Sequence, residues 1–195
     1  MRTLSILVIA MLCVTPLFAE GFFEITYGSG CIHSEDFDAL LEAPSVGFNF
    51  GYDTAVADTG IFFDLELGYE VSTHEIDGEP SERTFRNHRG FIGGKIKYGG
   101  LGYVEPYVGF GVMAYTYYEA SDAASAAMYP DFEIDKNLSG SYLVYGIDFF
   151  FNKEGWFALG VENRTMEYSV VDPDNSATTA DAAVERLAFK MMVLF

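Results

Sequence analysis

The sequence predicts an all-β fold, an eight-stranded antiparallel up-and-down barrel that crosses a membrane. Three observations support this prediction. Eight segments alternate apolar residues with polar or small ones, as strands with two different faces do. The connections between them are alternately short and long, as in a barrel whose two termini lie at one end. The last ten residues form such a segment, and the chain ends on Phe195 with no polar tail.

The N-terminus predicts a signal peptide at Met1–Ala19, followed by one barrel domain at 20–195. A basic residue, an apolar run from Leu4 to Val14 and a small residue at the cleavage point fit this interpretation. A transmembrane anchor fits less well, because the run is shorter than the roughly 20 residues that a spanning helix needs. Cleavage leaves Cys31 as the single cysteine, so the mature chain cannot close an internal disulfide.

The first four strands are expected at Phe23–Tyr27, Val46–Tyr52, Phe63–Val71 and Arg89–Tyr98. In the first three, aromatic and aliphatic residues alternate with acidic residues, small polar residues or glycine. The fourth places isoleucines and a tyrosine on one face and arginine and lysines on the other. This period of two predicts strands with one apolar face and one polar face.

The last four strands are expected at Val104–Tyr117, Tyr142–Phe151, Trp156–Met166 and Arg186–Phe195. Most of the eight segments are close in length to the roughly 9 to 11 residues that a tilted strand needs to cross a bilayer. Hydrocarbon offers no hydrogen bonds to an open strand edge, so the sheet should close on itself.

The connections divide into two kinds. Short turns are expected at Asp53–Thr59, Gly99–Gly102 and Asn152–Gly155, and long polar loops at Cys31–Pro44, Thr73–Asn87, Glu119–Asn137 and Val170–Ala183. This arrangement predicts that both termini lie in the periplasm and that the long loops face outward.

A soluble barrel with an apolar interior would show the same alternation, and the charges decide between the two. The polar face carries both signs in nearly equal number, so charges removed from water can pair. We therefore assign a structural charge network to the lumen, formed by Asp64, Glu66, Glu70, Arg89, Lys95, Lys97, Glu105, Asp148, Glu162, Arg164, Arg186 and Lys190. Small residues share this face, as a narrow interior requires: Gly47, Gly51, Gly68, Gly109, Gly111, Gly146 and Gly160.

Two stretches resemble small bacterial outer-membrane barrels of the OmpA-like, OmpX-like and opacity-type group. Glu105–Val112 is similar to their Pro-Tyr-x-Gly-x-Gly stretch, and Leu159–Arg164 to their Leu-Gly-x-Glu-Tyr-Arg pattern, from which Asn163 departs. The resemblance implies an integral protein of the bacterial outer membrane, surrounded by outer-membrane lipid. These motifs are short, and they specify a fold without specifying an activity.

The terminal strand resembles the last strand of outer-membrane barrels, whose final aromatic residue is part of the signal read by the barrel-assembly machinery. The resemblance implies that this signal is Phe189, Met191, Val193 and Phe195. We expect a monomer. A formal net charge of -18 argues against nucleic acid as a partner, because both would be polyanions.

No catalytic, cofactor or metal site is expected. Outer-membrane lipid A deacylases carry His-x-Ser on a strand with a nearby Glu, but here Ser72 and His74 stand in reversed order. We interpret these two residues as solvated loop positions. Asp172–Ser176 has carboxylates at a spacing that could hold calcium, but it lacks the glycine and distal glutamate of a calcium loop.

Two functions remain open. A structural or surface-interaction role, such as adhesion or ligand binding, would reside in the long acidic loops, and its ligand is unknown. The alternative is a channel for small or hydrophobic solutes. We favour the first because the expected lumen also contains Tyr107, Met113, Tyr115 and Tyr142, and side chains can fill an eight-stranded interior.

Overall fold

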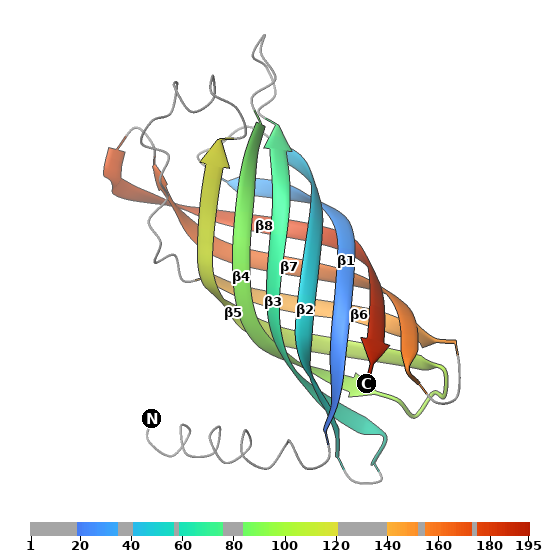
Figure 1. Cartoon of the computed structure of the whole chain (residues 1–195). Coiled ribbons are helices and arrows are strands. Elements are labelled where there is room, and N and C mark those ends of the chain that lie inside the picture. The colour runs from blue at the N-terminus through green and yellow to red at the C-terminus, as the bar shows by residue number, and fades with distance from the viewer. Residues whose placement is uncertain are drawn as a thin grey trace, which may run out of the picture.

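A computed structural model shows a closed barrel of eight strands (Figure 1). It describes residues 19–34, 41–56, 59–75, 84–120, 140–151, 155–172 and 175–195. The strands are β1 (Ala19–Ser34), β2 (Leu41–Ala55), β3 (Ile61–Glu75), β4 (Thr84–Tyr98), β5 (Val104–Ala120), β6 (Gly140–Phe150), β7 (Phe157–Asp172) and β8 (Asn175–Leu194). The expected signal peptide lies outside the described residues except for Ala19, with which β1 begins.

Each strand pairs antiparallel with its neighbours in the sequence, and β8 pairs with β1 to close the sheet. At the closure, the backbone N–H of Gly21 donates to the carbonyl oxygen of Phe195, and that of Phe195 donates to Gly21. Each of the three short turns contains a glycine with positive φ, namely Gly60, Gly102 and Gly155. The prediction of an eight-stranded antiparallel up-and-down barrel is confirmed.

We call the end of the barrel that holds Gly21, Phe195 and the three short turns the terminal end, and the opposite end the distal end (Figure 1). The middle parts of the first three expected long loops lie outside the described residues. No helix among the described residues is long and apolar enough to span a membrane.

The strands are longer than predicted, at 11 to 20 residues. The expected loop at Val170–Ala183 is wrong: β7 continues to Asp172 and β8 begins at Asn175, with Val170 paired to Ala180. The strands also enter the other three expected loops, so that β1 reaches Ser34 and β3 reaches Glu75. Backbone pairing continues beyond the part of each strand that needs an apolar face. The alternating pattern covers only that part, so it predicts strands that are too short.

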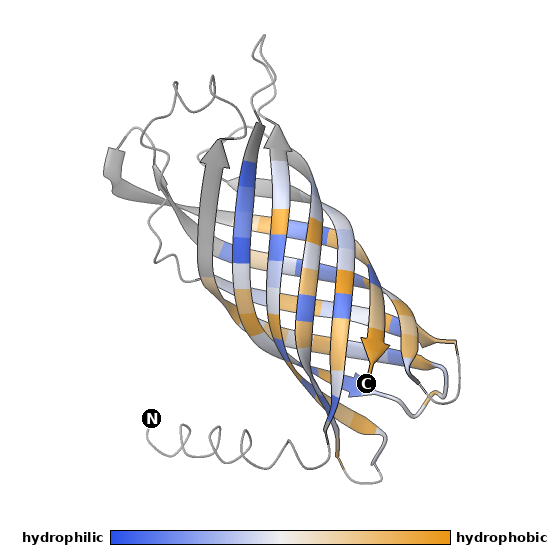
Figure 2. Ribbon diagram, in the orientation of Figure 1, coloured by the Kyte–Doolittle hydropathy of each residue, from blue (hydrophilic) through white to orange (hydrophobic). Residues whose placement is uncertain are grey.

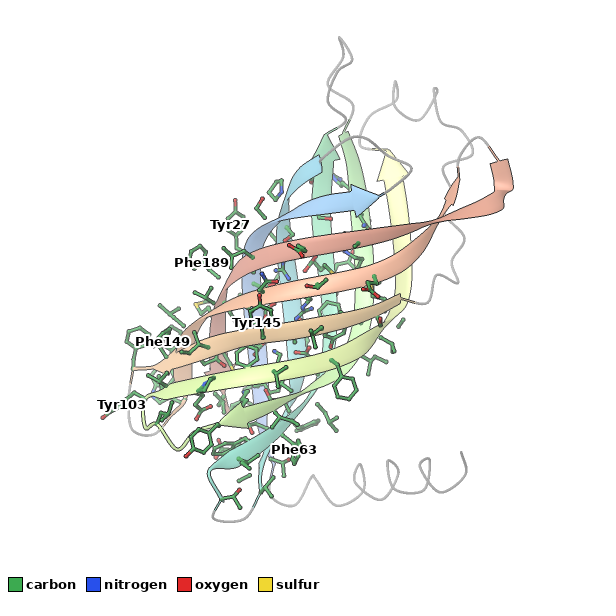
Figure 3. The ribbon with its side chains drawn as sticks, turned by 180° about the vertical axis from the view of Figure 1, so that it is seen from behind. Tyr27, Phe63, Tyr103, Tyr145, Phe149 and Phe189 are labelled. Atoms are coloured by element: carbon green, nitrogen blue, oxygen red, sulfur yellow. The ribbon has the colours of Figure 1, made fainter. Side chains whose placement is uncertain are left out.

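Alternate residues along each strand point outward and inward, and most of the outward residues are apolar (Figure 2). Phe110 and Phe189 are 72% and 68% exposed, whereas Lys95 is 1% exposed. The outward aromatic residues Tyr27, Phe63, Tyr103, Tyr145, Phe149 and Phe189 are labelled in Figure 3. The barrel therefore has a polar core and an apolar surface, the reverse of a soluble barrel, as lipid requires.

Interior glycines leave room for large side chains that cross the lumen. A Cβ atom at Gly68 would collide with the ring of Phe91, and one at Gly111 would collide with the ring of Tyr142. A Cβ at Gly146 would meet the ring and hydroxyl of Tyr107 in the same way. The interior is therefore packed by complementarity of glycine and aromatic side chains from different strands.

We expect Gly68→Val to destabilise the barrel by about 1 to 3 kcal/mol, because the new side chain must displace the ring of Phe91. Urea titration of the protein refolded in detergent micelles measures the change. Ser141→Val adds a similar group to the outer face of β6 and should be nearly neutral. Equal stability of the two variants would show that the interior is loosely packed.

Candidate functional site: the charged barrel interior

The strands bring thirteen charged side chains into the barrel interior, each with less than a tenth of its surface exposed. The acidic ones are Glu24, Asp53, Asp64, Glu66, Glu70, Asp148 and Glu162, and the basic ones are Arg89, Lys95, Lys97, Arg164, Arg186 and Lys190. Eleven of the twelve residues assigned to the network from the sequence lie in this set. The twelfth, Glu105, is half-buried near the terminal end, beside Asp148 in register.

Sequence analysis missed Glu24 and Asp53. Glu24 stands between the outward-facing residues Phe23 and Ile25, so the period of two was enough to place it inside. Asp53 was assigned to a turn, but β2 continues past it and pairs it with Asp64. Asp53 was not recognised because the small residues that follow it, Thr54 to Ala57, lack the large apolar side chains that mark the other strands.

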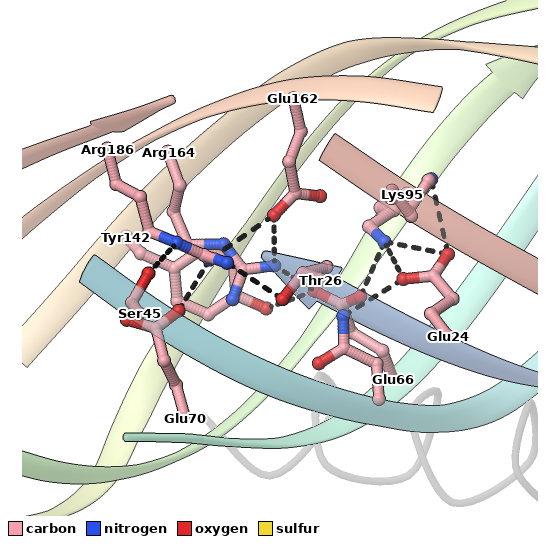
Figure 4. A network of polar contacts seen from close by, with 12 residues as sticks. Glu24, Thr26, Ser45, Glu66, Glu70, Lys95, Tyr142, Glu162, Arg164 and Arg186 are labelled. Atoms are coloured by element: carbon pink, nitrogen blue, oxygen red, sulfur yellow. Dashed lines mark hydrogen bonds and ion pairs between the residues drawn. The ribbon is translucent and has the colours of Figure 1, made fainter. Parts of the chain in front are cut away.

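Lysines and carboxylates form one half of the network. Glu24 lies 3.0 Å from Lys95 and 3.2 Å from Lys190. Lys95 also reaches Glu66 at 2.7 Å, and Lys190 reaches Asp148 at 2.8 Å. These five side chains come from five strands, so the ion pairs tie opposite walls of the barrel together. Figure 4 labels three of them, Glu24, Glu66 and Lys95.

The interior becomes apolar at the terminal end. There the ammonium of Lys97 lies 2.6 Å from Asp64 and 3.5 Å from Asp53, and 5.5 Å from the centre of the Phe22 ring. Phe22 belongs to a buried apolar cluster with Ala158 and Met192. This cluster therefore lies beside Lys97 in the terminal part of the lumen.

Arginines form the other half of the network, nearer the distal end. The Arg89 guanidinium lies 2.8 Å from Glu70, which also pairs with Arg186. Glu162 lies 3.3 Å from Arg164 and 3.6 Å from Arg186. Each carboxylate here bridges two arginines, so no member of the cluster is an isolated pair (Figure 4).

Aromatic side chains complete the coordination of these charges. The Arg164 guanidinium lies over the ring of Phe91, 4.3 Å from its centre, and 4.9 Å from the centre of the Tyr142 ring. The Tyr142 hydroxyl donates to Glu66 at 2.8 Å, and the Tyr107 hydroxyl donates to Glu162 at 3.2 Å. Tyr142 thereby joins the lysine half of the network to the arginine half.

Side chains fill the part of the barrel interior that the structure describes. Arg89, Lys95 and Arg164 are each only 1% exposed, although they lie at different heights in the lumen. A continuous water-filled path beside them would leave their side chains accessible. The charged groups are therefore arranged to pair with one another and to fill space between the walls.

The interpretation of Ser72 as a solvated loop position is wrong, because β3 continues past it and turns its side chain inward. Ser72 is buried in the lumen, and its hydroxyl accepts a hydrogen bond of 2.9 Å from Arg89. The side chain of His74 lies outside the described part of the structure. His88 is on the outer side, where its Nδ1 lies 2.6 Å from the Tyr69 hydroxyl. No group of three or more potential metal ligands is found among the described residues.

The residues assigned to the assembly signal lie on β8. Phe189, Met191 and Phe195 are exposed on the outer face, and Val193 is partly covered there. Phe195 also makes the backbone bonds that close the barrel against Gly21. Recognition of these residues by an assembly machinery remains a prediction.

No protein-family model matches the sequence, and no curated protein is detectably similar to it. Solved structures share its fold. Neisserial surface protein A matches with a TM-score of 0.66 at 13% identity, over 90% of this chain and 97% of that one. Ail, the attachment invasion locus protein of Yersinia pestis, solved with the heparin analogue sucrose octasulfate, matches with a TM-score of 0.52 at 10% identity, over 91% and 99%.

The outer membrane enzyme PagL matches with a TM-score of 0.52 at 11% identity, over 87% of this chain and 98% of that one. At such identities the likeness concerns the fold alone. One of the three is named as a surface protein, one as an attachment protein and one as an enzyme. Together with the apolar outer face, the likeness shows that this chain has the architecture of a small bacterial outer-membrane β-barrel.

We expect Glu66→Ala to lower the free energy of unfolding by about 3 to 5 kcal/mol, because Lys95 and Arg164 then lose a buried partner. Urea titration in micelles measures this loss. Glu185→Ala removes an exposed carboxylate from the outer face of β8 and should cost less than about 0.5 kcal/mol. The double variant Glu66→Leu with Lys95→Met should recover part of the loss, since it removes both charges. A Glu66→Ala variant as stable as Glu185→Ala would contradict the charge network.

Proposed function

We propose that the protein is a surface-interaction protein of the bacterial outer membrane, in which a rigid, closed barrel presents acidic loops to partners outside the cell. This proposal rests on how charge is distributed between the barrel interior and the rest of the chain. Among the residues whose burial the structure describes, the barrel interior holds six basic and seven acidic side chains, a net charge of -1, whereas the whole sequence has 11 basic and 29 acidic residues. Almost all of the chain's net charge of -18 therefore belongs to residues outside the interior.

The acidic residues gather in the connections at the distal end. Residues 35–42 contain four carboxylates, and residues 75–82 contain four more. Residues 131–135 add three. The basic residues in these connections are Arg83 and Lys136, with Arg86 just inside β4. Since β1 begins and β8 ends at the terminal end, where the short turns also lie, the topology supports an orientation with the acidic connections outside the cell.

The negative charge of these connections favours positively charged partners. Ail was solved with a heparin analogue, which is a polyanion. This chain's distal connections would repel a polyanion, and they would attract a cationic protein or peptide, or the divalent cations between surface lipids. We therefore propose cationic partners. Membrane insertion itself would use the outward residues of β8 as the signal for the barrel-assembly machinery.

Neutralising the acidic connection with Asp131→Asn, Glu133→Gln and Asp135→Asn should weaken binding of fluorescent hexalysine to cells that display the protein. The effect should shrink as salt is raised, because exposed charges are screened. Asp58→Asn with Glu154→Gln neutralises two short turns and is the matched control. Equal loss in the control, or no loss in the first variant, would count against an acidic outward face.

Conduction tests the alternative channel function. Because ion pairs and tyrosines fill the described lumen, the purified protein in planar lipid bilayers should give only small or rare conductance steps. The Arg164→Ala variant, which removes a side chain packed between Phe91 and Tyr142, should conduct more often than the unchanged protein. Large and reproducible channels from the unchanged protein would make transport the better account.

A further inference from the structure

Register partners form a row that circles the barrel once and ends higher than it began. The row starts at Phe23 on β1 and returns to β1 at His33, ten residues nearer the distal end, through Phe50, Leu67, Ile92, Val112, Ser141, Glu167 and Ala183. This climb is the stagger that tilted strands need to close a barrel. Half a turn, from β3 to β7, therefore corresponds to five residues along a strand.

At the distal end, the outer faces of β3 and β7 differ in polarity. Glu167 lies in the same row as Leu67, so the residue of β7 that is level with Leu67 is Glu162, five residues before it. From that height toward the distal end, the outward residues are Leu67, Tyr69 and Val71 on β3, and Asn163, Thr165 and Glu167 on β7. Beside β7, Ser141 and Glu185 are also exposed. The β7 wall becomes polar at a height where the β3 wall is still apolar.

At the terminal end, the two walls differ in the opposite sense. Beside β7, the large apolar side chains of Phe151, Trp156 and Phe195 are exposed. The turn between β2 and β3 exposes the small residues Ala55 and Thr59 instead. The apolar belt on the β7 side is therefore displaced toward the terminal end at both of its boundaries.

We propose that the barrel lies tilted in the membrane, with its β7 wall displaced in the distal direction, so that the distal part of β7 contacts lipid head groups and not acyl chains. Polar side chains that face hydrocarbon cost free energy, and the cost falls toward the head groups. A displacement by one outward position is about 5 Å along the barrel axis. It moves Thr165 and Glu167 toward the head groups, and it moves Phe151 and Trp156 toward hydrocarbon.

A bilayer that is thinned beside β7 is the competing explanation. Thinning would accommodate the polar distal part of β7, but it would leave Phe151 and Trp156 in water at the terminal end. Tilt accommodates both ends of the wall. The inference uses only the membrane architecture of the barrel, so it does not depend on the proposed surface function.

Tryptophan quenching in lipid nanodiscs that hold one barrel each tests the tilt. Thr165→Trp and Val71→Trp, each in a Trp156→Phe background, place a single indole on one of the two walls. Thr165 lies about one residue farther from the distal end than Val71, so an upright barrel would hold it at least as deep in lipid. We expect the reverse, with Thr165→Trp quenched about two- to threefold more strongly by iodide and more weakly by acyl-brominated lipid.

A second pair of positions tests the terminal end. Native Trp156 and Ile61→Trp in the Trp156→Phe background lie at the same height on the two walls. Tilt predicts stronger quenching of Trp156 by the brominated lipid and stronger quenching of Ile61→Trp by iodide. Heat-modifiable migration in detergent gels checks that every variant is folded.

The two pairs together decide between the explanations. Equal quenching within both pairs would show an upright barrel and overturn the tilt. A difference in the first pair alone would show thinning beside β7, which also overturns it. Protection of Thr165→Trp from both quenchers in densely packed vesicles, but not in nanodiscs, would show that a second copy of the chain covers this wall and would overturn the contact with head groups.

Discussion

The exclusion of water from hydrocarbon is the constraint on which the rest of this structure depends. Every backbone N–H and C=O group within the membrane has to find a partner in the protein, and the closed ladder from β1 round to β8 supplies it. Closure then creates an interior that is sealed from lipid. Charged residues such as Lys95 and Glu162 can occupy it only in pairs, because an unpaired charge removed from water is costly.

Paired charges and glycines together allow side chains to fill the narrow interior of the barrel. Eight strands enclose a space just wide enough for side chains, and the ion pairs span it from wall to wall. Glycines such as Gly68 and Gly111 let Phe91 and Tyr142 cross the space and pack against Arg164. The outcome is a packed interior that uses six of the chain's basic residues, so the residues outside this network carry almost all of the net charge of -18.

The parts of the fold that lipid constrains were predictable from the sequence. A strand such as β3 needs one face for lipid and one for the lumen, so its alternation of Leu65 and Leu67 with Asp64 and Glu66 reveals both its conformation and its orientation. The paired strand ends between Val170 and Ala183 were not predicted, because a strand pair outside the membrane needs no apolar face. The small polar residues of this stretch therefore resemble a loop. Which carboxylate pairs with which cation was also beyond prediction, since it depends on the register of distant strands.

The structure predicts that the apolar face of the barrel lies in lipid and that the charged face is sealed inside. Fluorescence quenching by brominated lipids tests it most directly, with Phe110→Trp introduced into a Trp156→Phe background that has no other tryptophan. Phe110 lies on the outer face and is 72% exposed. In vesicles of lipid brominated on the acyl chains, the tryptophan should be strongly quenched and should be insensitive to iodide in the water. Quenching by iodide with no effect of the brominated lipid would show that this face of the barrel lies in water.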